Sequence, residues 1–344
     1  MIKYYFLVLS AGFFLLVGCN SSTKNQQNTS GISVIFETDM GNDVDDALAL
    51  DMLYKYSDMG LINLLGISTN KDSPYSIEFL DLMNTWYGYS ELPMGKITKG
   101  ADCENDATNY AKATCLYQED GKSPFKKTYK DYGEIPEAPQ FYREVLSKQP
   151  DNSVVLVSVG FSTNIARLLD TQPDKFSPLT GKELVAKKVK LLSMMAGNTV
   201  DKTMKEYNVV KDVPAARKIF DEWPTPIVAS PFEVGISILF PATVIENNLD
   251  YANPNPLKIA YESYLPMPYD RPTWDLTSVL YAVEGTKNYF NLSEWGRMEA
   301  DTDGHTWFYP DKNGKHAYLS VNREQAEIIK NRFVELVTAK PHNK

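Results

Sequence analysis

The chain has 344 residues, of which 43% are hydrophobic, enough to form the core of one large α/β domain or two smaller ones. Its 44 acidic residues outnumber 35 Lys and Arg residues, which gives a formal net charge of −9. This negative balance argues against nucleic acids as partners and against adhesion of the protein surface to acidic membranes.

The first nineteen residues predict an export signal that is not part of the fold. Lys3 gives a positive start, and the apolar stretch 4–17 is too short to span a bilayer comfortably. The tetrapeptide LVGC ending at Cys19 resembles the end of a bacterial lipoprotein signal peptide, which implies a lipid on that cysteine; an ordinary cleaved signal is the alternative. The polar segment 20–31 predicts a flexible tether before a domain at 32–340. We therefore expect an exported protein, lipid-anchored to a bacterial membrane on its periplasmic or cell-surface side.

Strand-like apolar runs alternate with helix-like segments along this domain. Continuous β-branched runs between amphipathic helices predict one Rossmann-like α/β domain, with a mostly parallel central sheet flanked by helices. Strands are expected at 33–37, 61–68, 153–158, 189–194 and 226–229, and helices at 45–56, 75–87, 138–147, 163–169, 214–220, 257–264, 275–283 and 323–337.

Polar sequence interrupts the alternation between residues 100 and 135, where we expect a loop that flanks a site. It contains Cys103 and Cys115, the only cysteines after Cys19. In an exported protein these two could form a disulfide that closes a short loop, and two unpaired thiols are the alternative.

Four carboxylates follow the first predicted strand in the segment 39–46, which reads DMGNDVDD. Two ionised carboxylates about 4 Å apart repel by about 4 kcal/mol at an effective dielectric constant near 20, so a cluster of them needs a cation or a shared proton. Helix capping accounts for one acid, Asp43 or Asp45. An EF-hand is excluded because Val44 stands where the loop needs Gly and Leu50 where it needs Glu. The cluster predicts a hard-cation site.

More polar residues follow the later predicted strands, so in a parallel sheet they would face the same site. Each alone has an ordinary explanation as a turn residue or a helix cap, but their joint position at strand ends favours a shared function. They are Asn70, Gly160 to Asn164, Met195 to Asn198, Glu206 to Asn208, and Trp274 with Asp275.

Together these segments resemble one family, the nucleoside hydrolases, which are calcium-dependent N-ribohydrolases of the inosine–uridine-preferring type. The resemblance covers residues 33–338, and its most specific element is the N-terminal motif, commonly D-x-D-x-G-x-D-D-A. Here the motif reads ETDMGNDVDDA from Glu37 to Ala47. It is two residues longer after Gly41 and its first acid is Glu, which resembles a variant branch of the family. Supporting matches are VG at 159–160, STN at 162–164, MAG at 195–197, EYN at 206–208, and Asp275.

The resemblance implies a calcium ion bound by Asp39, Asp46, Asp275 and the backbone carbonyl of Val159. An all-oxygen site of this kind suits Ca²⁺ better than zinc. Asp39 would also act as general base on the attacking water. The implied reaction is hydrolysis of the N-glycosidic bond of a ribonucleoside or related N-riboside, which releases ribose and a base through an oxocarbenium-like cation.

The same resemblance implies how the sugar is held. Asp45 would accept a hydrogen bond from the 2′-hydroxyl, while other side chains contact the remaining ribose oxygens or offer an apolar wall. The further oxygen contacts would come from Asn70, Glu206 and Asn208, and the wall from Met195 and Tyr207. Family members are commonly dimers or tetramers, so a homodimer or homotetramer is possible here.

The sequence departs from the family on the side of the leaving base. Many members have a histidine directly before the late calcium-binding Asp, and it is thought to protonate the departing base. Here Trp274 precedes Asp275, and an indole cannot serve as an acid near neutral pH. Of the three histidines, His305, His316 and His342, only the first is a plausible substitute. We expect Trp274 to stack on an aromatic ring, either the base or a neighbour.

The aglycone is therefore not predicted. A lipid-anchored, calcium-dependent nucleoside- or sugar-binding protein without hydrolytic activity is the competing hypothesis. Three further expectations concern the same region: Arg271 lies in a turn and could pair with the acidic cluster, Tyr261 and Tyr264 serve ordinary packing rather than an aglycone pocket, and Glu233 could approach the base.

Overall fold

The computed structural model describes residues 1–2, 31–101 and 109–344. The lipidation site predicted at Cys19, the tether at 20–31 except its last residue, and the thiol of Cys103 lie outside the described residues, so the anchor and the disulfide remain predictions. Cys115 is buried. Within the described ranges, no helix combines the length and the apolar character needed to cross a membrane.

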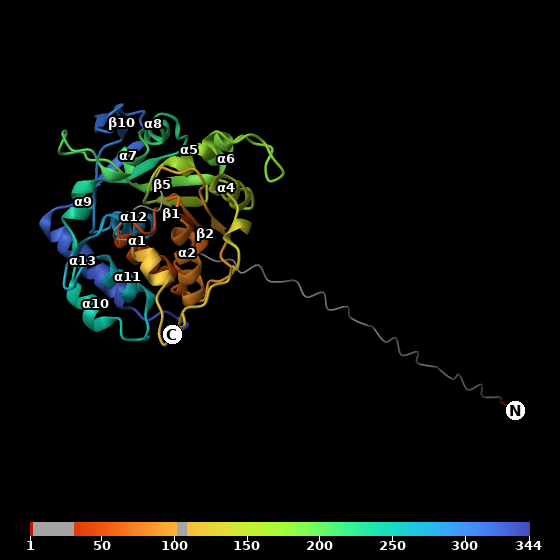
Figure 1. The fold of residues 1–344 in the computed structure, drawn as a ribbon. Helices are drawn as coiled ribbons and strands as arrows, with labels where there is room; N and C mark the ends of the chain where they lie inside the picture. Colours follow the sequence, from red (N-terminus) through yellow and green to blue (C-terminus); the bar gives the residue numbers. More distant parts are fainter. Residues whose placement is uncertain (3–30, 102–108) are drawn as a thin grey trace.

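The centre of the molecule is one sheet whose strands run in the order β11-β10-β12-β6-β5-β4-β1-β2-β3 (Figure 1). The path from β12 to β3 is parallel, whereas β10 and β11 are antiparallel at one edge and β9 pairs antiparallel with β12. The strands are β1 (Ile32–Thr38), β2 (Ile62–Thr69), β3 (Met94–Gly95), β4 (Val154–Ser158), β5 (Val189–Met195), β6 (Ile227–Ser230), β9 (Asn291–Leu292), β10 (Gly296–Ala300), β11 (Thr306–Pro310) and β12 (His316–Ser320).

Helices cover both faces of this sheet. Those that share the larger core are α1 (Asp45–Asp58), α2 (Pro74–Tyr87), α11 (Pro256–Tyr264), α12 (Trp274–Glu284) and α13 (Arg323–Thr338). Those that share the second core are α4 (Ala138–Ser147), α5 (Thr163–Leu169), α6 (Gly181–Lys188) and α8 (Val213–Glu222), towards the top of the view in Figure 1. The smaller elements are α3 (Tyr110–Cys115), η1 (Tyr132–Glu134), α7 (Tyr207–Lys211), α9 (Phe232–Ile236), α10 (Ala242–Asn248), and an antiparallel pair of β7 (Leu239–Phe240) with β8 (Arg271–Pro272).

The central strands bury both of their faces, which explains their uninterrupted apolar sequences. In β1, Val34 and Phe36 belong to the first core while Ile35 belongs to the second. In β4, Val157 faces the first core and Leu156 the second. Alternate side chains point to opposite faces of a strand, so a parallel strand between two helical layers must be apolar throughout.

The predicted fold class is confirmed: one α/β domain with a mostly parallel sheet flanked by helices. The predicted strands and helices all appear, with bounds that shift by only a few residues. Several elements were not predicted, among them β3, α6, α7, α9, α10 and the pair of β7 and β8. Two longer regions also differ from the sequence analysis. The segment 100–135, expected as a loop, contains α3 and η1, and residues 291–320, to which no element was assigned, form β9 to β12.

The register of the parallel strands brings their carboxyl ends to one edge of the sheet. Glu37 of β1 pairs with Ser68 of β2 and with Ser158 of β4, which in turn pairs with Met194 of β5. The residues that follow these positions therefore lie at the same edge. They include Asp39, Asn70, Val159 and Met195.

Candidate active site

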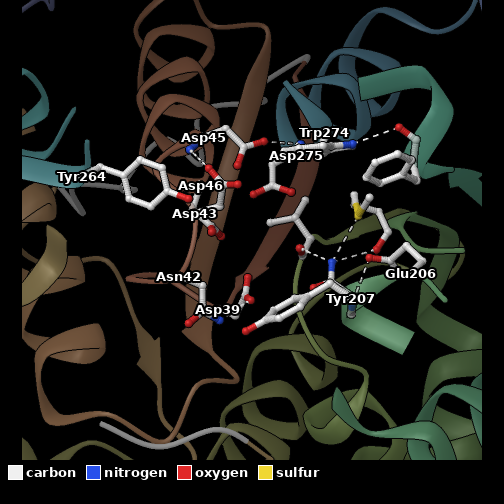
Figure 2. Close-up of a pocket in the computed structure, with 14 residues that line it drawn as sticks. Asp39, Asn42, Asp43, Asp45, Asp46, Glu206, Tyr207, Tyr264, Trp274 and Asp275 are labelled. Carbon is white, nitrogen blue, oxygen red and sulfur yellow. Dashed lines mark hydrogen bonds between the residues drawn. The ribbon is translucent and has the colours of Figure 1, made fainter. Parts of the chain in front are cut away.

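A cavity of about 300 Å³ opens at this edge of the sheet. Of the eleven residues predicted for the site, ten line it and only Asn70 does not. Figure 2 shows the lining side chains, which come from both ends of the chain. The lining residues are Asp39, Asn42, Asp43, Asp45, Asp46, Val159, Met195, Glu206, Tyr207, Asn208, Phe232, Tyr264, Trp274 and Asp275.

Three buried carboxylates meet where α1 and α12 begin. Oxygen atoms of Asp45, Asp46 and Asp275 all lie within 4.8 Å of one another, and Figure 2 shows these side chains grouped together. The Asp275 amide donates a hydrogen bond of 3.0 Å to Asp45 Oδ2, and the Thr38 hydroxyl donates to Asp46. Burial, followed by the charges of neighbouring acids, raises the pKa of all three carboxyls well above the ordinary value. A hard divalent cation with oxygen ligands fits this donor set, because it would offset both burial and repulsion.

Asp39 lies directly after β1 in the same cavity but outside that group of three. Its Oδ2 accepts a hydrogen bond of 2.6 Å from Asn42 Nδ2, and Asn42 Oδ1 accepts one of 2.6 Å from Lys71 Nζ. Burial raises the pKa of Asp39 to about 6, while the Asn42 hydrogen bond and the Lys71 charge oppose this rise. The sequence analysis predicted Asp39, and not Asp45, as a metal ligand beside Asp46 and Asp275. The three carboxylates that lie closest together in the structure include Asp45 instead of Asp39.

A network of backbone hydrogen bonds fixes Glu206 at the start of α7. Its carboxylate accepts from the amides of Asn208 (2.8 Å), Val209 (3.1 Å) and Gly197 (3.1 Å). Burial raises the pKa of Glu206 to about 7. The Asn208 amide nitrogen donates to the carbonyl of Val159 at 2.9 Å, so the backbone oxygen predicted as a metal ligand is held by a neighbouring site residue.

Asn70 is wholly buried behind the cavity and does not line it. Its Nδ2 donates to Glu37 Oε1 at 3.0 Å and to the carbonyl of Phe161 at 2.8 Å. Tyr142 and Ser158 also donate to Glu37, whose pKa is raised to about 7 by burial. In this structure Asn70 thus connects β2 to the loop after β4, and its predicted contact with ribose remains a prediction.

One side of the cavity is aromatic. Trp274 Nε1 donates to the carbonyl of Phe232 at 2.9 Å, and the two rings lie 5.4 Å apart. The ring planes are tilted by 31°, so Trp274 packs against a neighbouring ring without the parallel stacking that was expected. Tyr264 lines the cavity, against the expectation of ordinary packing, and its hydroxyl accepts a hydrogen bond of 3.0 Å from Arg271. Arg271 pairs with Asp43, and its Nε lies 2.8 Å from Asp43 Oδ1. The expectation that Arg271 could pair with the acidic cluster is therefore confirmed.

Other candidate residues lie away from the cavity. His305 Nδ1 lies 3.1 Å from Asp301 Oδ2 in the turn between β10 and β11, and His305 does not line the cavity. Glu233 accepts a hydrogen bond of 3.0 Å from the Thr199 amide and is likewise absent from the lining. Tyr261 is buried and stacks on Tyr269 with ring centroids 4.5 Å apart, as packing residues do.

Sequence reasoning missed three residues of the site: Asn42, Phe232 and Lys71. Phe232 follows β6 directly, so the rule that found the other strand-end residues could have found it as well. Asn42 lies inside the acidic segment but was not given a role. Lys71 follows Asn70, and no sequence signal distinguishes it from an ordinary surface lysine.

The fold and the cavity together define the nucleoside hydrolase class, and comparison with protein families gives the same result. Over residues 34–330 the chain matches the family model of the inosine-uridine preferring nucleoside hydrolases. The chain belongs to this family and is by class an N-ribohydrolase, which hydrolyses the N-glycosidic bond of ribonucleosides. No curated protein matches it in sequence.

Solved structures of nucleoside hydrolases share the fold. The plant nucleoside hydrolase PpNRh1 is 17% identical, with a TM-score of 0.68 over 90% of this chain and 99% of its own. The purine-preferring ribonucleoside hydrolase from Gardnerella vaginalis is 18% identical, with a TM-score of 0.66 over 89% and 99%. The inosine-uridine preferring nucleoside hydrolase from Bacillus anthracis is 16% identical, with a TM-score of 0.61 over 89% and 99%.

Proposed function

We propose that the protein is a calcium-dependent hydrolase of ribonucleosides or related N-ribosides. The observation that carries this proposal is the meeting of Asp45, Asp46 and Asp275 within 4.8 Å, with acids from both ends of the chain in one cavity. When bound, a calcium ion would lower the pKa of a water molecule and bind ribose hydroxyls. Asp39, Asp46, Asp275 and the carbonyl of Val159 would hold it.

Asp39 is the group that accepts the proton of the attacking water. Its Oδ2 accepts a hydrogen bond from Asn42, which orients the carboxylate. Asn42 and Lys71 hold this carboxylate in place.

The remaining polar side chains orient the sugar. Asp45 accepts from the 2′-hydroxyl, and Asn70, Glu206 and Asn208 are proposed for the other ribose oxygens, with Met195 and Tyr207 as the apolar wall. A ribosyl cation about 6 Å from an ionised carboxylate is stabilised by about 3 kcal/mol at an effective dielectric constant near 20. The ring of carboxylates thus favours the charge that develops as the glycosidic bond breaks.

Ribose release from a panel of nucleosides tests this function. The purified protein is incubated with inosine, uridine, adenosine, cytidine and aryl ribosides, with calcium or with EGTA. We expect ribose in calcium, its loss in EGTA, and its return when excess calcium is added. Activity that persists in EGTA would contradict calcium dependence, and the absence of ribose from every substrate would contradict hydrolysis.

A binding protein without hydrolytic activity is the second candidate. It is favoured by one observation: among the described cavity-lining residues there is no histidine that could protonate a leaving base. Calorimetry separates the two functions. Tight, calcium-dependent binding of a ribonucleoside that is recovered intact would favour the binding protein, whereas conversion to ribose and base would exclude it.

We also propose that Cys19 carries a lipid that holds the domain at a membrane. The proposal is supported by the LVGC sequence and by the polar tether that follows it. The wild-type protein should fractionate with membranes and incorporate labelled palmitate, and Cys19→Ser should do neither. A Cys19→Ser variant that still incorporates label would contradict the proposal.

A further inference from the structure

One buried carboxylate joins the ends of neighbouring strands behind the cavity. Glu37 of β1 is wholly buried, and its Oε1 accepts hydrogen bonds from Asn70 Nδ2 at 3.0 Å and from Ser158 Oγ at 3.1 Å. Its Oε2 accepts a hydrogen bond from the hydroxyl of Tyr142 on α4. Both oxygens of Glu37 are therefore occupied, and Glu37 does not line the cavity.

Tyr142 is itself held on two sides. Its hydroxyl oxygen lies 2.6 Å from Ser68 Oγ of β2, and because Tyr142 donates its hydrogen to Glu37, the Ser68 hydroxyl donates to Tyr142. The ring belongs to the second core, beside Phe141, with ring centroids 5.2 Å apart. A buried polar network whose members are all hydrogen-bonded is rigid, so Tyr142 fixes Glu37 from the helical layer.

Asn70 connects Glu37 to the turn that follows β4. Its Nδ2 donates to the carbonyl of Phe161 at 2.8 Å as well as to Glu37, and its own amide donates to the carbonyl of Thr38 at 2.9 Å. The Val159 amide donates to the carbonyl of Glu37 at 2.9 Å. The turn from Val159 to Phe161 is thus tied to β1 through both the backbone and the side chain of Glu37.

Gly160 brings this turn into direct contact with Asp39. A Cβ atom at position 160 would lie 2.5 Å from Asn70 Oδ1, 2.7 Å from the Asp39 nitrogen and 2.8 Å from Asp39 Cβ. Such distances leave no room for a side chain, so the backbone of Gly160 packs directly on Asp39 and Asn70. Asp39 and the adjoining carbonyl of Val159 are both proposed calcium ligands, and their relative position is set at this contact.

The length of Glu37 allows it to reach all of its partners. The motif of the nucleoside hydrolases commonly begins with Asp, whereas here it begins with Glu37. An aspartate is shorter by one methylene group. At this position it could not keep the hydrogen bonds to both Asn70 and Tyr142 unless β1 or α4 moved.

We propose that Glu37 and Tyr142 are positioning residues that set the placement of Asp39 relative to the Val159 carbonyl from behind the cavity. This inference rests on the proposed calcium-dependent function, because Asp39 and that carbonyl are proposed ligands. Neither positioning residue lines the cavity. Loss of a group that orients a metal ligand without touching the ion typically costs about 10- to 100-fold in metal affinity or activity.

Calorimetric titration of the calcium-free protein, together with ribose release, tests the inference. Tyr142→Phe removes the hydroxyl and keeps the ring. We expect the Kd for calcium to rise about tenfold, and kcat at saturating calcium to fall about tenfold with KM within about threefold.

Tyr54→Phe is the matched control, because the Tyr54 hydroxyl is also buried and donates to Asn84 Oδ1 at 2.6 Å away from the cavity lining. It should lower stability in urea about as much as Tyr142→Phe and leave calcium affinity and kcat unchanged. If the two variants have equal calcium affinity and kcat, the inference is overturned while the hydrolase function stands. A wild-type protein that binds no calcium would overturn both.

Glu37→Asp gives a second route to the same contact, and it keeps the inference testable if Tyr142→Phe does not fold. We expect it to weaken calcium binding about tenfold as well. The double variant should bind calcium no more weakly than the weaker single variant, because both changes break the same hydrogen bond. Losses of affinity that multiply in the double variant would show that the two residues act independently, which would overturn their pairing.

Discussion

The half of the cavity that we propose for the metal and the ribose differs, in what holds its side chains, from the half that we propose for the base. In the first half, Glu206 is fixed by three backbone amides and Asp275 stands at the start of a buried helix. In the second, Arg271 lies on a two-residue strand and is fixed by the side chains of Asp43 and Tyr264. Glu206 is thus held by the main chain, whereas Arg271 depends on two side chains that can move with it, so we expect the cavity to be more preorganised at Glu206 than at Arg271.

The largest effect on activity is expected from Asp275→Asn in the metal-facing half. This change removes one of three converging charges, so we expect activity to fall at least about 10³-fold and calcium affinity, measured by calorimetry, to fall with it. Without calcium, the variant should be more stable than the wild type by about 1 kcal/mol, because a buried repulsion is removed.

Asp303→Asn is the matched control, since Asp303 is exposed in the turn after β10. It should change neither calcium affinity nor stability. If Asp275→Asn bound calcium as tightly as the wild type, the metal site would have to lie elsewhere.

Glu206→Gln tests the side chain that three backbone amides hold in the half of the cavity proposed for the metal and the ribose. A glutamine keeps one oxygen but turns an NH₂ group toward amides that themselves donate, so at least one hydrogen bond is lost. We expect a loss of about 2 kcal/mol in the free energy of unfolding, measured with urea, and a fall of about 100-fold in kcat/KM.

The exposed Glu335 offers a control, because Glu335→Gln changes the same group where it contacts no site residue. Equal effects of the two substitutions on kcat/KM would show that Glu206 has no role in the cavity.

Arg271→Met should have a smaller effect, confined to the base-facing half. Loss of the guanidinium leaves Asp43 unpaired and removes the support of the Tyr264 and Trp274 rings. We expect KM to rise about tenfold with kcat within about threefold, because binding of the base is affected more than the chemical step. Steady-state kinetics measure both constants. A change in kcat alone would place Arg271 in the chemistry instead.

The same contrast explains how much could be read from the sequence. The parallel strands were predictable because each is a continuous apolar run, and the strand-end rule then placed Asp39, Val159 and Met195 at one edge. Tyr264 was misjudged, because it reaches the cavity from the end of α11, where no periodicity marks an inward-facing side chain. Arg271 was left undecided, since its partner Asp43 lies more than 200 residues away in the chain.

The difference between buried and edge strands also explains why β9 to β12 were not predicted. Strands β10 and β11 lie at the edge of the sheet and are only partly buried. In β10 only Gly296 and Met298 are buried, and in β11 only Thr306. They contain charged or aromatic side chains rather than a β-branched run, so a search for buried parallel strands passes over them. Their pairing is fixed by contacts with β12 and β6, which only the folded chain reveals.

Substitution of His316 in β12 should have the smallest effect on activity, and it tests how well this side of the sheet buries an imidazole. It is buried, its Nδ1 accepts from the Met298 amide at 2.9 Å, and burial lowers its pKa to about 4. The folded protein therefore keeps His316 neutral below pH 6.5, whereas the unfolded chain takes up a proton. Stability should fall by up to roughly 3 kcal/mol as the pH drops from 6.5 to 4.

The comparison with His316→Gln isolates this contribution from that of the carboxylates, because a glutamine oxygen can accept the same amide hydrogen and does not titrate. We expect the variant to lose less stability than the wild type between pH 6.5 and 4 in urea unfolding, with nearly equal activity at pH 7. Parallel stability curves for the two proteins would mean that His316 has the same pKa in the folded and the unfolded state, and that its burial in β12 does not disfavour the charged imidazole.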